Sequence, residues 1–237
     1  MTFTNDIQNE NNTDFLLEAF NFQDSQKIAD ILNDLWGFGK NLPHQKIADG
    51  FGKTYLFYSL FESTYAFTLK YKNVPVAFIC WKENKSLDNK KNKTATKKNQ
   101  QGKIKFLQKP LLLLKSIRYA VPILFCKEFY YQIKAWKAFF NGTESLNKEL
   151  LHPYDAELIL FVSSKDFRGK GLGRKLFNFF TQTLEEHKLH SFFLHTDTEC
   201  SYQFYDKIGL SKLATKTMTE KNGSMQETWQ IFIYGTD

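Results

Sequence analysis

A glycine-rich turn between two apolar segments constrains the fold of this chain more than any other feature of its sequence. Residues 156–162 have the apolar character of a strand, and residues 172–187 have the spacing of an amphipathic helix. Unpaired N–H groups at the start of a helix attract anions, and glycine lets the backbone approach a phosphate closely. The sequence therefore predicts a strand, turn and helix that together bind an anion. The turn itself reads Arg168-Gly169-Lys170-Gly171-Leu172-Gly173-Arg174.

Strands and helices alternate along the chain. This alternation predicts an α/β fold whose sheet has mixed direction, because the first and last pairs of strands form hairpins. The length of 237 residues, 42% of them hydrophobic, suits one domain over residues 1–237. We expect helices at residues 24–36, 56–61, 111–119, 123–140, 172–187 and 202–207, and strands at residues 65–69, 76–81, 156–162, 191–195, 211–219 and 227–234.

The basic charge of the chain is local. The formal net charge is +7, and residues 82–105 hold nine lysines against two acids, so 9 − 2 = 7 places all of it there. We expect residues 84–101 to form a mobile, Lys-rich loop, and neither nucleic acid nor a membrane is clearly indicated as a partner. Three separated cysteines and an N-terminus without a signal-like segment predict a cytoplasmic protein. They are Cys80, Cys126 and Cys200.

The spacing of the glycine turn excludes two common phosphate-binding motifs. A P-loop requires Gly-x-x-x-x-Gly-Lys-Ser/Thr, and a dinucleotide fingerprint requires a glycine where Arg174 stands. The remaining match is Arg/Gln-x-x-Gly-x-Gly, which resembles the pyrophosphate loop of the GNAT acetyltransferase superfamily. The segment Phe204-Tyr205-Asp206-Lys207-Ile208-Gly209-Leu210 resembles the F/L-Y-E-K-x-G-F segment of that family, and the element order agrees. The resemblance implies the GNAT fold, a mixed and mostly antiparallel sheet flanked by helices, here with a helical insert at residues 104–148.

The resemblance also implies acetyl-CoA as a cosubstrate. In this family the pantetheine arm wedges between two separating parallel strands, here residues 157–162 and 191–195, and the backbone of Phe161 and Val162 would bind it. Thr198 stands where family members often have asparagine, so it would contact the cofactor with a shorter side chain. The residues implied for the pyrophosphate are Arg168, Gly169, Lys170, Gly171, Leu172, Gly173 and Arg174.

Glu157 and Tyr205 are the candidate catalytic residues. An amine must lose a proton before it attacks a thioester, and Glu157 precedes Arg168 by 168 − 157 = 11 positions, as in the histone-acetyltransferase branch of the family. Strand alternation predicts that Glu157, Ile159 and Phe161 share one face, so the carboxylate would lie beside apolar residues. The alternative is a structural glutamate that pairs with lysine or faces solvent. Tyr205 matches the family tyrosine that protonates the departing thiolate, and a core aromatic is its alternative.

Other reactive side chains have simpler interpretations. His195 and Asp197 could supply an auxiliary base or a substrate-binding carboxylate, although Asp197 or Thr198 would equally cap a helix. Cys200 is expected to be a buried, inert thiol. His187 and His190 lack further ligands nearby in sequence, so no metal is expected.

Two classes of function stay open. The resemblance implies an acetyl-CoA-dependent N-acetyltransferase that acts on a primary amine of a small molecule or peptide, by direct attack in a ternary complex. The alternative is an inactive GNAT-fold binding module that engages a membrane surface or nucleic acid. The insert either lies on such a surface or, as we favour, forms a helical pair that covers the acceptor site or a dimer face. The acceptor amine and the oligomeric state, including a homodimer, are left open.

Overall fold

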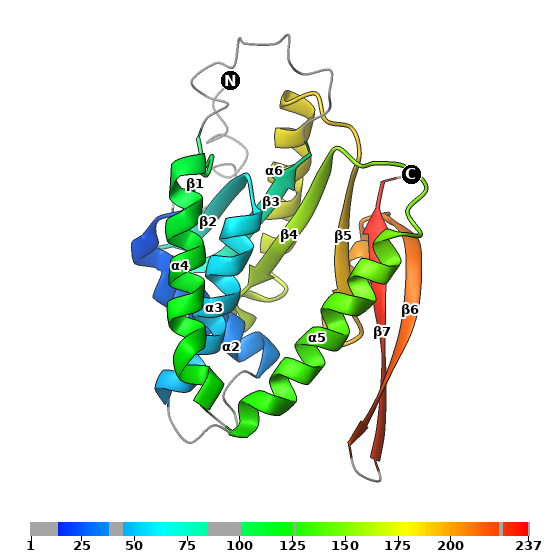
Figure 1. Ribbon diagram of the computed structural model, residues 1–237. Helices are drawn as coiled ribbons and strands as arrows, with labels where there is room; N and C mark the ends of the chain where they lie inside the picture. Colours follow the sequence, from blue (N-terminus) through cyan, green and yellow to red (C-terminus); the bar gives the residue numbers. More distant parts are fainter. Residues whose placement is uncertain (1–13, 38–44, 85–100, 126, 223–224, 237) are drawn as a thin grey trace.

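The computed structural model describes residues 14–37, 45–84, 101–125, 127–222 and 225–236. Within these residues, seven strands form one sheet in the order β1-β2-β3-β4-β5-β7-β6 (Figure 1). Neighbouring strands are antiparallel except β4 and β5, which are parallel. The predicted α/β fold with a mixed, mostly antiparallel sheet is therefore confirmed. The strands are β1 (Phe15–Ala19), β2 (Tyr65–Tyr71), β3 (Val74–Glu83), β4 (Ala156–Ser163), β5 (Phe192–Asp197), β6 (Ser211–Asn222) and β7 (Met225–Gly235).

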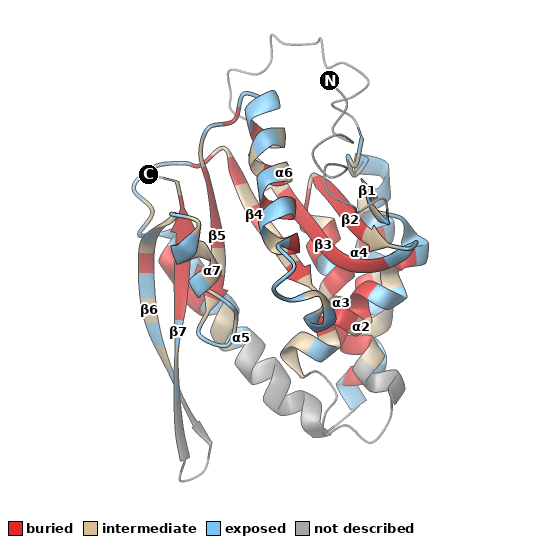
Figure 2. Cartoon of the chain, turned by 180° about the vertical axis from the view of Figure 1, so that it is seen from behind, coloured by how far each residue is buried: buried red, intermediate tan, exposed pale blue. Residues whose placement is uncertain are grey.

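Helices cover both faces of the sheet. On one face α2 and α3 pack against β3 and β4, α4 lies outside α3, and α5 crosses β6 and β7 (Figure 1). On the opposite face lie α6 and the short α7 (Figure 2). The helices are α2 (Ser25–Trp36), α3 (Gln45–Glu62), α4 (Lys109–Ala120), α5 (Lys127–Asn147), α6 (Leu172–Glu186) and α7 (Gln203–Lys207), with 3-10 turns η1 (Phe22–Asp24), η4 (Phe106–Gln108), η5 (Val121–Phe125) and η6 (Lys165–Phe167).

Three apolar clusters hold the layers together. The largest lies under α6, where the ring of fully buried Trp81 is 5.3 Å from that of Phe180. A second cluster lies between the sheet and α2, α3 and α4. A third joins α5 to the far half of the sheet and includes Leu146, Phe193 and Ile231. Because apolar burial is the main source of stability, these clusters fix the helices on which the site depends.

Local sequence signals explain several element boundaries. Lys72 and Asn73 have φ of 48° and 65°, the left-handed geometry of a two-residue hairpin turn, and they join β2 to β3 as predicted. Helix α2 ends before Gly37, also as predicted. Gly142 lets α5 approach the sheet, because a Cβ there would lie 2.7 Å from Ile231 Cδ1.

Three elements differ from the prediction. Strand β1 was not predicted, since its five residues depend on pairing with β2 and on tertiary ion pairs of Lys70 with Glu18 and Asp24. Helix α3 is longer than residues 56–61. The second insert helix begins at Lys127 rather than residue 123, because η5, which contains Pro122, precedes it. Most of the predicted Lys-rich loop at residues 84–101 lies outside the described residues.

Candidate functional site

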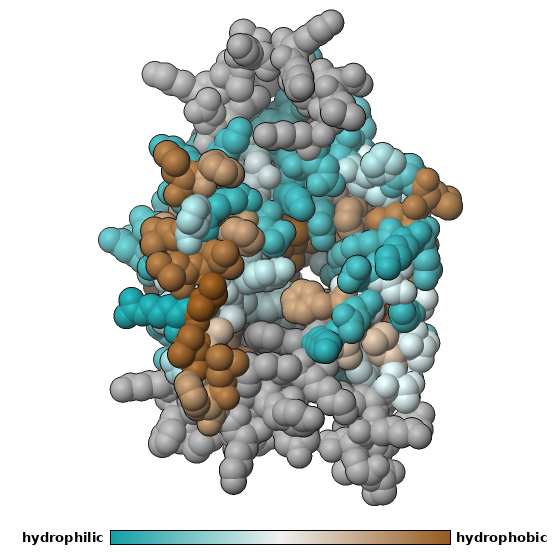
Figure 3. Space-filling view, in the orientation of Figure 1, coloured by the Kyte–Doolittle hydropathy of each residue, from teal (hydrophilic) through white to brown (hydrophobic). Residues whose placement is uncertain are grey.

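Strands β4 and β5 pair only at their beginnings and then separate. Ala156, Glu157 and Leu158 pair with residues 192–194, and the later residues of β4 have no partner on β5. Strand β4 continues along β3, whereas β5 continues along β7. The two parallel strands therefore open a gap in the sheet, as expected for the strands that would hold a pantetheine arm. The surface on the α3 and α5 face is hollowed between α4 and α5 (Figure 3).

A β-bulge lies at the start of this gap. Cys80 pairs with Leu160 and Trp81 pairs with Leu158, so Ile159 is an extra residue without a partner on β3. The bulge breaks the alternation of side chains along β4. Phe161 consequently packs with the α6 cluster, whereas Ile159 packs with the cluster under α3. The prediction that Glu157, Ile159 and Phe161 share one face was wrong for this reason.

The backbone of β4 beyond the bulge has groups directed into the gap. The Ser164 N–H donates to Val76 O at 2.8 Å, which sets the alternation of the ladder with β3. Hydrogen bonding in an antiparallel pair alternates along each strand, so Val162 bonds to β3 while Phe161 and Ser163 point the other way. The N–H and C=O groups of Phe161 and Ser163 can therefore bond a ligand in the gap. The expectation that the backbone of Val162 would also bind the cofactor was wrong, because the N–H and C=O groups of Val162 bond to β3.

The glycine turn follows at the wide end of the gap. Gly169 and Gly171 have φ of 76° and 72°, and a Cβ at either position would meet no atom within 4 Å. Gly171 is the N-cap of α6 and has no side chain to accept from the first N–H groups of the helix. Arg168 and Arg174 are exposed beside them. Open space, free N–H donors and cationic side chains together fit a pyrophosphate such as that of acetyl-CoA.

Other residues of the turn have structural tasks. Leu172 is buried in the α6 cluster and anchors the helix. A Cβ at Gly173 would lie 3.5 Å from the Phe204 ring and 3.7 Å from the Phe161 ring, so this residue lets α6 lie close to β4 and α7. Lys170 is exposed and its Nζ lies 4.5 Å from the centre of the Phe167 ring.

Glu157 lies beside His195 on the face of the sheet that carries α3 and α5. Glu157 Oε1 is 3.4 Å from His195 Nδ1, and His195 Nε2 is 2.8 Å from Asn147 Oδ1. The side chains of Glu157 and His195 are 22% and 14% exposed. One residue comes from β4, one from β5 and one from the end of α5. The carboxylate and the imidazole can hold a proton between them at the narrow end of the gap.

Negative charge and aromatic rings surround this pair. Burial, followed by the charges of Glu62 and Glu157, raises the pKa of Tyr58 on α3. The Tyr58 ring lies 6.1 Å from the Phe140 ring, so α3 and α5 meet near Glu157. Of the two insert helices, α5 therefore contacts this face through Phe140 and Asn147, whereas α4 packs outside α3.

Tyr205 lies on α7, on the opposite face of the sheet. The ring of its neighbour Phe204 is 5.7 Å from that of Phe161, and the Tyr205 ring is 5.5 Å from that of Tyr234. Tyr234 Oη donates to Asp206 Oδ1 at 2.7 Å and ties α7 to β7. Burial, followed by interaction with Cys200, raises the pKa of Tyr205, so its phenol is protonated at neutral pH.

The turn after β5 is chiefly structural. Asp197 Oδ1 accepts from the N–H groups of Glu199 and Cys200 at 2.9 and 3.0 Å. These amides belong to a turn, and the N-cap of α7 is Tyr202, so Asp197 holds the turn and does not cap the helix as expected. Thr198 Oγ1 accepts from the Gln230 N–H at 3.2 Å, so this hydroxyl has a partner on β7. Burial, followed by the charge of Asp197, raises the pKa of the Cys200 thiol to about 12, so it is not a thiolate at neutral pH.

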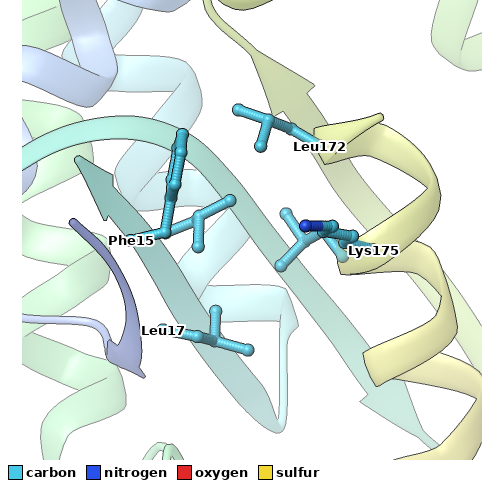
Figure 4. Close-up of a pocket in the computed structure, with 6 residues that line it drawn as sticks. Phe15, Leu17, Leu172 and Lys175 are labelled. Atoms are coloured by element: carbon cyan, nitrogen blue, oxygen red, sulfur yellow. The ribbon is translucent and has the colours of Figure 1, made fainter. Parts of the chain in front are cut away.

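Other candidate sites do not lie at the gap. Among the described residues no three His, Cys, Asp or Glu side chains are grouped to hold a metal ion, and His187 Nδ1 lies 2.5 Å from Glu83 Oε1. A hollow of about 10 Å³, the size of one water, lies between Phe15 and Leu17 of β1 and Lys175 of α6 (Figure 4). A cavity of about 120 Å³ lies between β1 and the start of α4 and has no residue of β4 or β5 in its wall.

The contacts of Glu157 with His195 and of His195 with Asn147 could not be read from the sequence. His195 follows Phe193 by two positions, and Phe193 pairs with Glu157, so the two side chains meet only because of this register. Asn147 lies at the end of α5, outside the motifs that carry the family resemblance in the sequence. The presence of a histidine at the end of a predicted strand was the single available signal.

Comparison with known proteins agrees with this geometry. The sequence profile of FR47-like proteins matches residues 138–219, which run from α5 to β6 and include β4, the glycine turn, α6, β5 and α7. No curated protein matches the chain in sequence.

Several solved structures are similar to this chain. A proposed phosphinothricin N-acetyltransferase is 13% identical, with 94% of this chain and 98% of that chain covered and a TM-score of 0.50. Ard1 from Thermoplasma volcanium is 12% identical, with 94% and 97% covered and a TM-score of 0.49. A third structure is yncA, a proposed acetyltransferase from Salmonella typhimurium solved with its cofactor acetyl-CoA. It is 12% identical, with 94% of this chain and 93% of that chain covered and a TM-score of 0.46. The chain therefore shares the fold of the proposed phosphinothricin N-acetyltransferase, and its residues 138–219 match the FR47-like family model.

Proposed function

We propose that this protein is a cytoplasmic N-acetyltransferase that transfers the acetyl group of acetyl-CoA to a primary amine of a small molecule or peptide. The observation that supports this most is the gap between β4 and β5, with the glycine turn at its wide end and Glu157 at its narrow end. Acetyl-CoA supplies an activated acyl group as a thioester. The residues of the chain bind it, take a proton from the amine and return a proton to the thiolate.

The cofactor would lie with its pantetheine arm in the gap. The N–H and C=O groups of Phe161 are free to bond the amides of that arm, and Val162 holds β4 against β3 beside it. At the glycine turn, the first N–H groups of α6 would bind the pyrophosphate, and Arg168 and Arg174 would add charge. Thr198 can still donate its hydroxyl proton, because its oxygen is the acceptor in the contact with Gln230.

Glu157 and His195 would take the proton from the acceptor amine. A protonated amine cannot attack, so a base must act before or during attack by the amine nitrogen on the thioester carbon. The proton would pass to Glu157 Oε1 or to His195 Nδ1, 3.4 Å apart, and Asn147 would keep the imidazole ring oriented. Direct attack needs both substrates bound together. Cys200 is not a thiolate at neutral pH, so it would not take up the acetyl group first.

The surroundings of Glu157 favour a cationic acceptor. Glu62 and Glu157 both act on Tyr58, so negative charge is concentrated where the amine would arrive. Tyr58 and Phe140 would border the acceptor from α3 and α5. On the opposite face, Tyr205 would donate its phenolic proton to the departing thiolate, and Tyr234 with Asp206 would hold α7 in place.

Two measurements test the proposal. Calorimetric titration with acetyl-CoA should show binding at micromolar concentrations, and a panel of primary amines should include at least one that causes acetyl-CoA-dependent thiol release. Absence of acetyl-CoA binding by a folded sample would contradict the proposal and leave the binding-module alternative. Binding without thiol release for any amine, small or peptidic, would contradict the proposed transfer.

A further inference from the structure

Helix α4 carries an apolar stripe on its outer side. The six residues Phe106, Leu107, Leu111, Leu114, Ile117 and Phe125, called here the α4 stripe, are all exposed, and Phe106, Leu107 and Phe125 are 84%, 87% and 85% exposed. In Figure 3, apolar surface runs along the position that α4 and the turns at its two ends occupy in Figure 1. Leu111, Leu114 and Ile117 follow one another at intervals of three residues, so they project from one side of α4.

The opposite side of α4 is firmly packed. Leu112 is 2% exposed in the cluster shared with α2 and α3. Ser116 Oγ donates to Thr54 O at 3.1 Å, and Lys109 Nζ donates to Phe61 O at 2.6 Å. The side of α4 that packs in the core is therefore already occupied, and the α4 stripe is not part of the core of the same molecule. A stripe this large on a described surface commonly marks an interaction site.

Basic side chains accompany the stripe on α4 and on the segment before it. Residues 101–125, which the structure describes, contain five lysines and arginines and neither aspartate nor glutamate. Lys103, Lys105 and Arg118 are exposed close to the stripe in sequence. Lys115 instead turns inward, with its Nζ 5.4 Å from the centre of the Phe22 ring, so its stem borders the stripe. An occupant of this surface must therefore tolerate apolar contact and supply negative charge.

We propose that the α4 stripe docks the protein on the surface of an anionic lipid bilayer. Twelve helical residues span about 18 Å, enough to lie in the plane of the interface with their apolar side chains among the acyl chains. Exposed lysine and arginine beside an apolar helix face are the pattern of helices that lie on anionic membranes. In the described residues no helix has the length and apolar character needed to cross a membrane. A second copy of the chain fits less well, because it would bring like charges together.

Vesicle flotation tests this docking. The full chain should float with vesicles of phosphatidylcholine and phosphatidylglycerol, and far less with phosphatidylcholine alone or at high salt, where charge is screened. The double variant Leu114→Glu/Ile117→Glu should reduce the bound fraction about tenfold, because charged groups replace two apolar contacts. Leu151→Glu is the matched control, since Leu151 is 97% exposed and lies outside α4; it should bind as the original chain does.

The outcomes separate this proposal from its rivals. No flotation with anionic vesicles, or equal flotation of the double variant, would overturn it. A dimer in solution that the double variant dissociates, without vesicle binding, would assign the stripe to a second copy instead. Binding to duplex DNA without binding to vesicles would also overturn it. Circular dichroism confirms that the variants fold, and calorimetry with acetyl-CoA keeps the result independent of the proposed enzymatic function.

Discussion

His195 Nδ1 lies 3.4 Å from Glu157 Oε1, across the two parallel strands that begin to separate at this point. The second ring nitrogen is held by Asn147 at 2.8 Å, so the imidazole has a partner on each side. A proton taken from an acceptor amine can rest on either member of the pair. Side chains from β4, β5 and α5 are therefore joined in one group of polar contacts.

Glu157→Gln should lower kcat about 100-fold to 1,000-fold, the usual range for loss of a general base. The amide keeps the size of the side chain but cannot take a proton. Acetyl-CoA affinity, measured by calorimetry, should stay unchanged because the cofactor would bind along the gap and the glycine turn. Glu144→Gln on the exposed side of α5 is the matched control. Unaltered kcat would remove Glu157 from the proposed mechanism.

His195→Ala should lower kcat about tenfold if the histidine positions and assists Glu157. Its effect should largely disappear in the Glu157→Gln background, because two residues that act as a unit are not additive. Steady-state kinetics of the single and double variants measure this coupling. Fully additive losses would show that His195 acts independently of Glu157.

Tyr205→Phe should lower kcat about 100-fold and leave acetyl-CoA affinity nearly unchanged. The variant keeps the ring that packs beside Tyr234 and loses the phenolic proton, which the raised pKa retains at neutral pH. Tyr202→Phe is a suitable control, because its ring packs against Phe232 at 5.0 Å on the same segment. Equal kcat for Tyr205→Phe and the original chain would exclude proton donation by this phenol.

Gly171→Ala should weaken acetyl-CoA binding about tenfold. The left-handed φ of 72° costs an alanine about 1–2 kcal/mol, and the new methyl group would occupy open space beside the free N–H groups. Gly209→Ala is a matched control, since Gly209 has φ of 84° and equally open surroundings. Urea unfolding should show similar destabilisation in both variants, whereas calorimetry should show weaker binding only for Gly171→Ala. Equal acetyl-CoA affinities of the Gly171→Ala and Gly209→Ala variants would contradict the proposed phosphate site.

Asp155→Ala should destabilise the fold by about 1–2 kcal/mol at neutral pH. Burial opposes ionisation of Asp155, but the hydrogen bonds from the N–H groups of His190 and Ser191 and from the Ser191 hydroxyl hold its pKa below the ordinary 3.8. The stabilisation that ionised Asp155 gives the fold is therefore complete above the pKa of Asp155 in the unfolded chain. It is lost as pH falls through the lower pKa of Asp155 in the folded protein. Urea unfolding of both proteins between pH 7 and 3 should show the difference shrinking only at the acidic end. A difference that is constant over this range would contradict the assignment.

The sequence was sufficient where a local signal decides the structure. Glycine at residue 37 ends α2, the pair at residues 72 and 73 turns the first hairpin, and the glycine turn opens α6. These features depend on backbone conformations that few residue types adopt, so composition at a single position is informative. The fold class followed from the order of such elements.

The sequence was insufficient where distant segments decide the structure. The bulge at Ile159 depends on how β3 and β4 align, and no residue type in the sequence indicates it. Strand β1 depends on contacts of Lys70 with Glu18 and Asp24. The position of Asn147 beside His195 depends on the path of α5 across the sheet. Each is a property of tertiary packing and register, which single-sequence patterns do not encode.

The gap between β4 and β5 is bordered by residues from both faces of the sheet. The glycine turn and α7 border it on one side, and Glu157, Tyr58 and α5 border it on the other. In the proposed reaction the cofactor and the amine would therefore approach from opposite faces of the sheet, and exchange of one would not require departure of the other.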